Sequence, residues 1–147
     1  MEDSIRQELM FLFLEYSREL RDINGGYLPG DELMSDVSLF YEYCDETLFK
    51  WHPIYYNEKM VGFLLTSDRE HGNITEAYIS PLYRGMGLME HAVMQYMIGK
   101  SSCLHMVLKT NVNAYEYWNH LFQKLGYRST IIPRAKDDGL LVLEWVR

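Results

Sequence analysis

The sequence has little of the chemistry that marks metal sites, redox centres or membrane spans. Its 147 residues include only two cysteines, Cys44 and Cys103, whose spacing matches neither a metal-binding nor a redox motif. The five histidines are scattered without paired spacing, so we expect no metal site. No apolar run approaches the roughly 18 residues of a membrane-spanning helix, and the first residues lack the basic flank of a signal peptide. These absences favour a cytoplasmic protein with reduced thiols and no membrane contact.

The composition is that of one globular domain, which we expect to span residues 1–147. Apolar residues make up 48% of the chain and charged residues 24%. Residues 1–60 hold 13 Asp and Glu against 5 Lys and Arg, a net charge of -8, whereas residues 61–147 have a net charge of +1. The acidic half disfavours nucleic acid as a ligand. It favours either a cationic partner or solvated helix faces.

Hydrophobic spacing predicts helices and strands in an order typical of an α+β domain with a mixed sheet. Helices are expected over residues 4–23, 31–48, 87–98 and 114–125. Strands are expected over residues 54–56, 60–66, 74–79, 104–109, 128–132 and 140–146. The first two strands and the last two each form a hairpin, and a polar turn is expected over residues 67–73.

The most informative segment is Arg84-Gly85-Met86-Gly87-Leu88, which leads from a predicted strand directly into a helix. The first backbone N–H groups of a helix have no intrahelical partner, and the helix dipole adds positive charge there. Gly85 and Gly87 lack the Cβ atoms that would keep a ligand away, and Arg84 adds a cation. This pattern indicates a diphosphate cradle, unless it is only a tight strand-to-helix turn. In a Gly-x-Gly-x-x-Gly pattern that starts at Gly85, the sixth position is Glu90, so the dinucleotide-binding pattern lacks its third glycine. The phosphate-binding sequence Gly-Lys-Ser/Thr is also absent.

The segment resembles the acetyl-CoA loop of the GNAT superfamily of N-acetyltransferases, Arg/Gln-x-x-Gly-x-Gly/Ala after an aliphatic-x-Pro strand end. Ile79-Ser80-Pro81 matches the strand end, and Arg84 and Gly87 match the loop. Met89 replaces the usual final Gly or Ala, which crowds the first helical turn but leaves its N–H in place.

The resemblance continues downstream and covers about residues 54–146. Asn111, Ala114 and Trp118 follow the family's Asn-x-x-Ala spacing with an aromatic residue four positions later. Leu125-Gly126-Tyr127 matches the family's helix end, with four more residues than usual before the glycine.

The resemblance implies a mixed central sheet, flanked by helices, whose two central parallel strands splay apart near 74–79 and 104–109. Residues 1–50 would form a helical acceptor-side region and residues 54–146 the core that binds acetyl-CoA as co-substrate. The pantetheine would pair with the backbone near Tyr78 and Ile79. Asn111 or Asn113 would either contact the pantetheine or cap the following helix. The implied cofactor-binding residues are Tyr78, Ile79, Arg84, Gly85, Met86, Gly87, Leu88, Met89 and Asn111.

The implied reaction moves acetyl to a primary amine, such as a small cationic amine or a peptide N-terminus. Glu76 is the leading general base, unless it is a surface glutamate, and it should share a strand face with Tyr78, opposite Ala77 and Ile79. The family's tyrosine acid is replaced, since counting along the last helix leads to Trp118 and Phe122.

Tyr117 and Tyr115 are the neighbouring candidate acids, with packing as their other role. These substitutions keep open an alternative function, a catalytically silent acyl-CoA-binding regulatory module. A homodimer is compatible with the sequence, which does not decide the oligomeric state.

Overall fold

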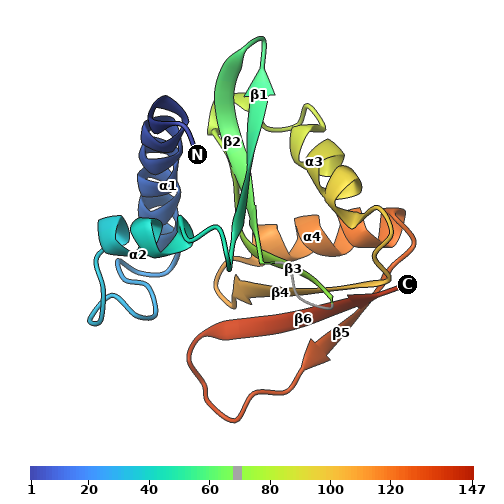
Figure 1. The fold of residues 1–147 in the computed structure, drawn as a ribbon. Coiled ribbons are helices and arrows are strands. Elements are labelled where there is room, and N and C mark those ends of the chain that lie inside the picture. Colours follow the sequence, from blue (N-terminus) through green and yellow to red (C-terminus); the bar gives the residue numbers. More distant parts are fainter. Residues whose placement is uncertain (68–70) are drawn as a thin grey trace.

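The computed structural model describes residues 1–67 and 71–147, where the six strands form one mixed sheet in the order β1-β2-β3-β4-β6-β5 (Figure 1). The elements along the chain are α1 (Asp3–Ile23), α2 (Asp36–Tyr43), β1 (Lys50–Tyr56), β2 (Lys59–Thr66), β3 (Gly72–Ile79), η1 (Pro81–Tyr83), α3 (Leu88–Met97), β4 (Ser102–Leu108), α4 (Val112–Lys124), β5 (Arg128–Ile132) and β6 (Leu140–Val146). The predicted mixed α+β architecture is confirmed. The turn expected over 67–73 lies partly outside the described residues.

Helix α1 is amphipathic, as its sequence predicts. Its buried residues lie three or four positions apart and so form one stripe along the helix, namely Leu9, Leu12, Phe13 and Ser17. The helix ends at Asn24, whose N–H binds the carbonyl groups of Leu20 and Arg21. Gly25 and Gly26 follow with positive φ angles of 78° and 102°, which glycine adopts without steric cost.

The second helix is shorter than the sequence predicts, because residues before and after it are held in turns. It spans Asp36–Tyr43 and not 31–48. The carboxylate of Asp31 accepts hydrogen bonds from Arg21 and from a backbone N–H in its own loop, so the chain up to residue 34 stays outside the helix. Beyond the helix, Asp45 accepts from an amide two residues later and forms a turn.

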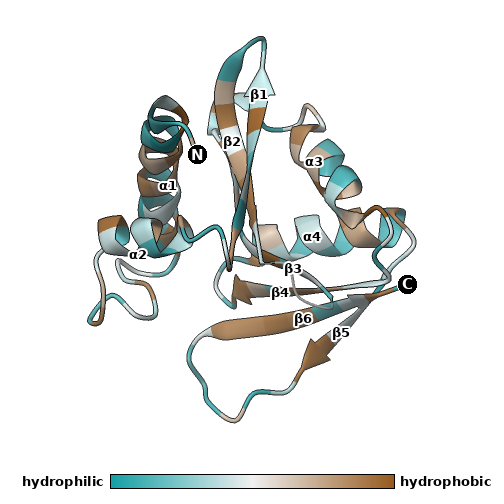
Figure 2. Ribbon diagram, in the orientation of Figure 1, coloured by the Kyte–Doolittle hydropathy of each residue, from teal (hydrophilic) through white to brown (hydrophobic). Residues whose placement is uncertain are grey.

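The sheet separates two hydrophobic cores. Figure 1 shows α1 and α2 on one side of β1 and β2, and α3 and α4 on the other. The larger core, under α3 and α4, centres on Phe122 and Trp145, whose rings stack with centroids 4.6 Å apart. The smaller core, under α1 and α2, is built around Phe13, Phe40 and Phe63. Figure 2 shows β2 and β6 as largely hydrophobic, whereas α1 and α3 mix hydrophobic and hydrophilic residues, as expected for helices covering a sheet.

Strand β3 directs alternate side chains into these two cores. Tyr78 packs in the smaller core, and Glu76 lies beside Tyr16 of α1. Ala77 and Ile79 contact the larger core. The predicted faces of β3 are therefore confirmed.

The two parallel strands at the centre of the sheet separate after a short pairing. β3 and β4 pair only between Gly72–Ile74 and Cys103–His105. Further along, β3 stays paired with β2 as far as Ile79, and β4 stays paired with β6. A bulge in the β2–β3 ladder leaves Thr75 without an opposite residue at the point of separation, and bulges bend a strand. The predicted splay is confirmed.

Candidate active site

The splay exposes backbone groups of β3 that have no strand to pair with. The N–H of Ser80 donates to Val61 of β2, and the carbonyl oxygen of Tyr78 also points towards β2, where a Cβ on Gly62 would lie 2.2 Å from it. Because backbone groups alternate along a strand, those of Ala77 and Ile79 point into the gap between β3 and β4. The carbonyl of Ile79 accepts a hydrogen bond from Arg84 Nε at 2.8 Å. With respect to residues 1–67 and 71–147, the groups left open to the gap are therefore the N–H of Ile79 and both polar groups of Ala77, whereas the backbone of Tyr78 is turned to β2.

The loop between β3 and α3 forms an open cradle of amides. Gly85 and Gly87 have φ angles of 79° and 76°, and a Cβ built on either glycine meets no atom within 4 Å. Within the described residues, the first backbone bond of the helix runs from His91 N to Gly87 O, and the amides of residues 85–89 donate to no described group. Unpaired amides at a helix N-terminus are what a diphosphate binds. The geometry of the loop therefore fits the diphosphate of a coenzyme.

Met89 and Arg84, at the two ends of this loop, also contact other parts of the fold. The side chain of Met89 is buried in the larger core, so it points away from the cradle and leaves its N–H available. Arg84 binds Glu19 of α1 with both terminal nitrogens, at 2.8 and 2.7 Å, and lies over the ring of Tyr78. The arginine thus ties the loop to α1 and to the end of β3.

Glu76 occupies a low-polarity site on the other face of β3. Burial raises the pKa of its carboxyl group from the ordinary 4.5 to about 7, although the hydroxyl groups of Tyr16 and Tyr43 act in the opposite direction. The same burial, together with the nearby Glu76 charge, raises the pKa values of both tyrosines. Glu76 can therefore gain or lose a proton near neutral pH, which is the property a general base needs.

A cleft of about 820 Å³ connects Glu76 with the splay. This volume is within the range of small-molecule sites. Its walls come from α1, α2 and the loop between them, from β3, β4 and β6, from the loop before β6 and from α4. Its lining includes Phe13, Tyr16, Tyr43, Glu76, Ala77, His105, Asn111 and Trp118.

Helix α4 contributes to this cleft, although without a tyrosine. Asn111 caps the helix by accepting from the N–H of Ala114 at 3.3 Å, and it also lines the cleft. Trp118 lines the cleft and is buried. Tyr115 packs against the larger core, and Tyr117 is half-exposed, so neither lines the cleft. Burial, and to a lesser degree Glu90, raises the pKa of Tyr117, which weakens it as an acid.

His105 lies at the last position at which β4 pairs with β3, opposite Ile74, and lines the cleft. Its ring meets Trp118 edge-on at 4.6 Å between centroids. Nδ1 is buried and has no hydrogen-bond partner among the described residues. Burial lowers the pKa of His105 from 6.5 to about 3, so the imidazole is neutral at physiological pH.

The structure thus adds residues that sequence patterns did not select. The backbone of Ala77 faces the gap, and Tyr16 and Tyr43 lie beside Glu76. His105 lies at the point where β3 and β4 separate. Only the alternation along β3 could have indicated Ala77, whereas the other three depend on contacts between distant segments. Among the described residues, no cluster of three His, Cys, Asp or Glu side chains could hold a metal ion. No helix in the described part of the chain is both long and apolar enough to cross a bilayer.

Taken together, the splayed sheet, the amide cradle and the buried acid define an acyl-coenzyme-binding α+β fold. The model of the acetyltransferase (GNAT) family matches residues 17–127, which is more than half of the chain. The chain therefore belongs to the GNAT acetyltransferase family, and the resemblance seen in its sequence is confirmed.

Solved structures share this fold at low sequence identity. An acetyltransferase from Thermus thermophilus has 17% identity and a TM-score of 0.68, over 100% of this chain and 92% of the other. The PaiA N-acetyltransferase from Thermoplasma acidophilum, in complex with coenzyme A, has 12% identity and a TM-score of 0.65, over 100% and 96%. Diaminobutyrate acetyltransferase EctA from Paenibacillus lautus, in complex with L-2,4-diaminobutyric acid and coenzyme A, has 12% identity and a TM-score of 0.65, over 96% and 88%. No curated protein matches the sequence.

Proposed function

We propose that this acetyltransferase moves an acetyl group from acetyl-CoA to a primary amine, with Glu76 as the general base. The observation that carries the proposal is the buried carboxyl group of Glu76, whose pKa is about 7 and which lies one residue from the open backbone of Ala77. Two structural relatives have coenzyme A bound, and one of them has an amine substrate, which supports the same chemistry here.

The residues can be assigned to the steps of this reaction. Glu76 takes a proton from the ammonium group, directly or through water, and the neutral nitrogen attacks the thioester carbonyl carbon. The N–H of Ile79 points into the gap and is the proposed donor to the oxyanion. The C–S bond then breaks, the new amide nitrogen loses its second proton, and the thiolate gains one.

The cradle at residues 85–89 is the proposed site of the coenzyme's diphosphate, and Asn111 is the proposed contact of its pantetheine arm. Tyr117 and Tyr115 remain the candidate donors to the thiolate. A thiol with a pKa of about 8.5 is also an acceptable leaving group without a dedicated acid. The reaction thus depends more on Glu76 than on either tyrosine.

The test is release of free thiol from acetyl-CoA in the presence of primary amines, together with the Glu76→Gln variant. Glutamine keeps the size of the side chain but cannot accept the proton, so we expect kcat to fall about 10²- to 10⁴-fold. The Kd for acetyl-CoA, measured by calorimetry, should stay unchanged. Equal turnover by the variant would remove Glu76 from the base role.

A catalytically silent regulatory module is the second candidate. The observation that favours it is the buried Trp118 at the family's tyrosine position, with Tyr115 and Tyr117 outside the cleft. Calorimetry separates the two functions, because a silent module binds acetyl-CoA and releases no thiol with any amine.

A further inference from the structure

The geometry points to a small primary amine on an apolar body, without a second charged group, as the acceptor. This inference rests on the proposed acetyl transfer and names the substrate class of the same cleft. It is carried by the residues around Glu76, by the ion pairs at the cleft wall and by the size of the cleft.

The wall of the cleft on the α1 and α2 side is mostly apolar. It is formed mainly by hydrophobic side chains of α1, of the loop before α2 and of α2, namely Phe13, Leu20, Leu28, Pro29, Leu33, Met34 and Leu39. Leu33 is 82% exposed although it lines the cleft. An exposed leucine at a cleft mouth gains free energy when an apolar ligand covers it.

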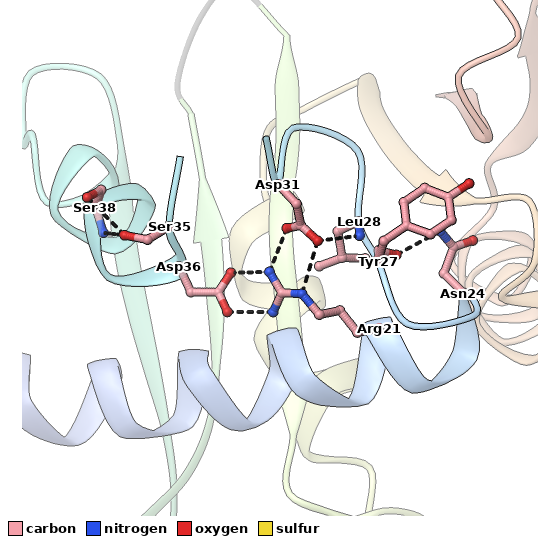
Figure 3. Close-up of polar contacts among 8 residues, drawn as sticks. All are labelled: Arg21, Asn24, Tyr27, Leu28, Asp31, Ser35, Asp36 and Ser38. Atoms are coloured by element: carbon pink, nitrogen blue, oxygen red, sulfur yellow. Dashed lines mark hydrogen bonds and ion pairs between the residues drawn. The ribbon is translucent and has the colours of Figure 1, made fainter. Parts of the chain in front are cut away.

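The charged groups of the cleft already have partners, with one exception. Among the described residues, the cleft is lined by the charged side chains of Asp31, Asp36, Glu76 and Arg134. Figure 3 shows the guanidinium of Arg21 between Asp31 and Asp36. Its Nη2 lies 2.6 Å from Oδ1 of Asp31, and its Nη1 lies 2.5 Å from Oδ2 of Asp36. Arg134 is paired with Asp138. Glu76 is therefore the single described charged group of the cleft without an ion-pair partner.

One carboxyl group can serve one ammonium group. The aromatic rings of Phe13, Tyr16 and Tyr43 lie around Glu76 and give a cationic amine further favourable contacts. A second ammonium group, as in a polyamine, would compete with Arg21, which already donates to all four carboxylate oxygens of Asp31 and Asp36. A carboxylate, as in an amino acid, would compete with Asp138 for the guanidinium of Arg134. A second charge without a partner of its own is costly to bury against the apolar wall, so polyamines and amino acids are both disfavoured as acceptors.

The acidity of the first 60 residues lies largely elsewhere. Glu19 binds Arg84, and Glu46 binds the N-terminal ammonium group at 3.0 Å. Neither glutamate lines the cleft. The negative charge of this half therefore gives no support to a polycationic acceptor.

The size of the cleft favours a small molecule over a peptide. Its 820 Å³ must hold the thioester end of the coenzyme as well as the acceptor. What remains suits a compact ligand. A peptide N-terminus would also bring backbone polar groups against the apolar wall of the loop before α2.

Thiol release at saturating acetyl-CoA tests the inference with three amines of equal length: hexylamine, hexane-1,6-diamine and 6-aminohexanoate. We expect kcat/KM for hexylamine to exceed the other two values about 10²-fold, since they place an unpaired charge on the apolar wall. Shortening hexylamine to butylamine should lower kcat/KM by about fourfold per methylene removed, the value of burying one such group.

A variant reverses this preference and provides the control. Met34→Glu places a second carboxylate without an ion-pair partner on the cleft wall, so kcat/KM should rise for the diamine and fall for hexylamine. Met94→Glu adds the same charge at an exposed position of α3 outside the cleft. It should change kcat/KM for neither the diamine nor hexylamine.

The outcomes separate this inference from the proposed function. Faster turnover of the diamine, of 6-aminohexanoate or of the peptide amide Leu-Gly-Gly than of hexylamine overturns the acceptor class and leaves acetyl transfer in place. Binding of acetyl-CoA without thiol release from any of these amines overturns acetyl transfer, and the acceptor class falls with it.

Discussion

Gly87 is the residue at which the cradle depends most directly on backbone conformation. Its φ angle of 76° is left-handed, and a Cβ there meets open space, so alanine would cause strain without a clash. We expect Gly87→Ala to lose about 1 kcal/mol of unfolding free energy and to weaken coenzyme A binding as the loop relaxes and its amides turn away. Calorimetry with coenzyme A and urea unfolding measure the two effects.

Gly99 provides a matched control for that substitution. It follows the same helix, has a φ angle of 78° and also faces open space. Gly99→Ala should therefore cost similar stability while the Kd for coenzyme A stays at the wild-type value. Equal affinity in the two variants would mean that the cradle does not hold the coenzyme.

At the scale of elements, the guanidinium of Arg21 ties the loop between α1 and α2 to both helices. Arg21 donates to Asp31 in the loop and to Asp36 at the start of α2 (Figure 3). Arg21→Ala should release the loop wall of the cleft, raise KM for the amine about tenfold and leave the Kd for acetyl-CoA unchanged, with roughly 1–3 kcal/mol of stability lost. Steady-state kinetics measure KM for the amine, calorimetry measures the Kd for acetyl-CoA, and urea unfolding measures the stability.

Arg18→Ala is the control for this element. Arg18 is exposed on the same helix and forms no ion pair with a described residue, so its removal should change neither KM nor stability by a measurable amount. A rise in KM for acetyl-CoA in Arg21→Ala, equal to the rise for the amine, would contradict a role confined to the acceptor wall.

The elements differ in how far the sequence could predict them. The final hairpin, 128–132 and 140–146, was predicted to the residue because its hydrophobic runs are separated by a clear polar turn. The helix predicted over 31–48 was too long, because its apolar periodicity continues through a segment that Arg21 holds by a contact ten residues away. Side-chain pairing at that distance leaves no periodic signal.

At the scale of the whole molecule, the sequence predicts only those parts of the candidate site that lie close together along the chain. The amide cradle could be predicted because all of its residues are consecutive. The environment of Glu76 could not be predicted, since Tyr16 and Tyr43 come from two other elements. Spacing along one strand gave Glu76 its face, and only the packed fold gave it a raised pKa.

Two buried groups of the cleft should shape the stability of the whole fold, with opposite signs. The folded protein disfavours protonation of His105, whose pKa falls from 6.5 to about 3, so between these values the unfolded chain binds more protons and stability rises with pH. The folded protein favours protonation of Glu76, whose pKa rises from 4.5 to about 7, so stability falls as pH increases through that window. Between pH 4.5 and 6.5 the two contributions offset each other.

Single variants separate these contributions in urea unfolding from pH 3 to 7.5. Relative to wild type, His105→Leu should gain stability as pH falls from 6.5 to 3, at up to about 1.4 kcal/mol per pH unit. Glu76→Gln should gain relative stability as pH rises from 4.5 to 7. Taking differences from wild type cancels the surface carboxylates that all three proteins share. Parallel curves for His105→Leu and wild type would mean that the imidazole at the strand separation is not kept neutral by burial, because loss of a group that titrates alike in both states cannot change the slope.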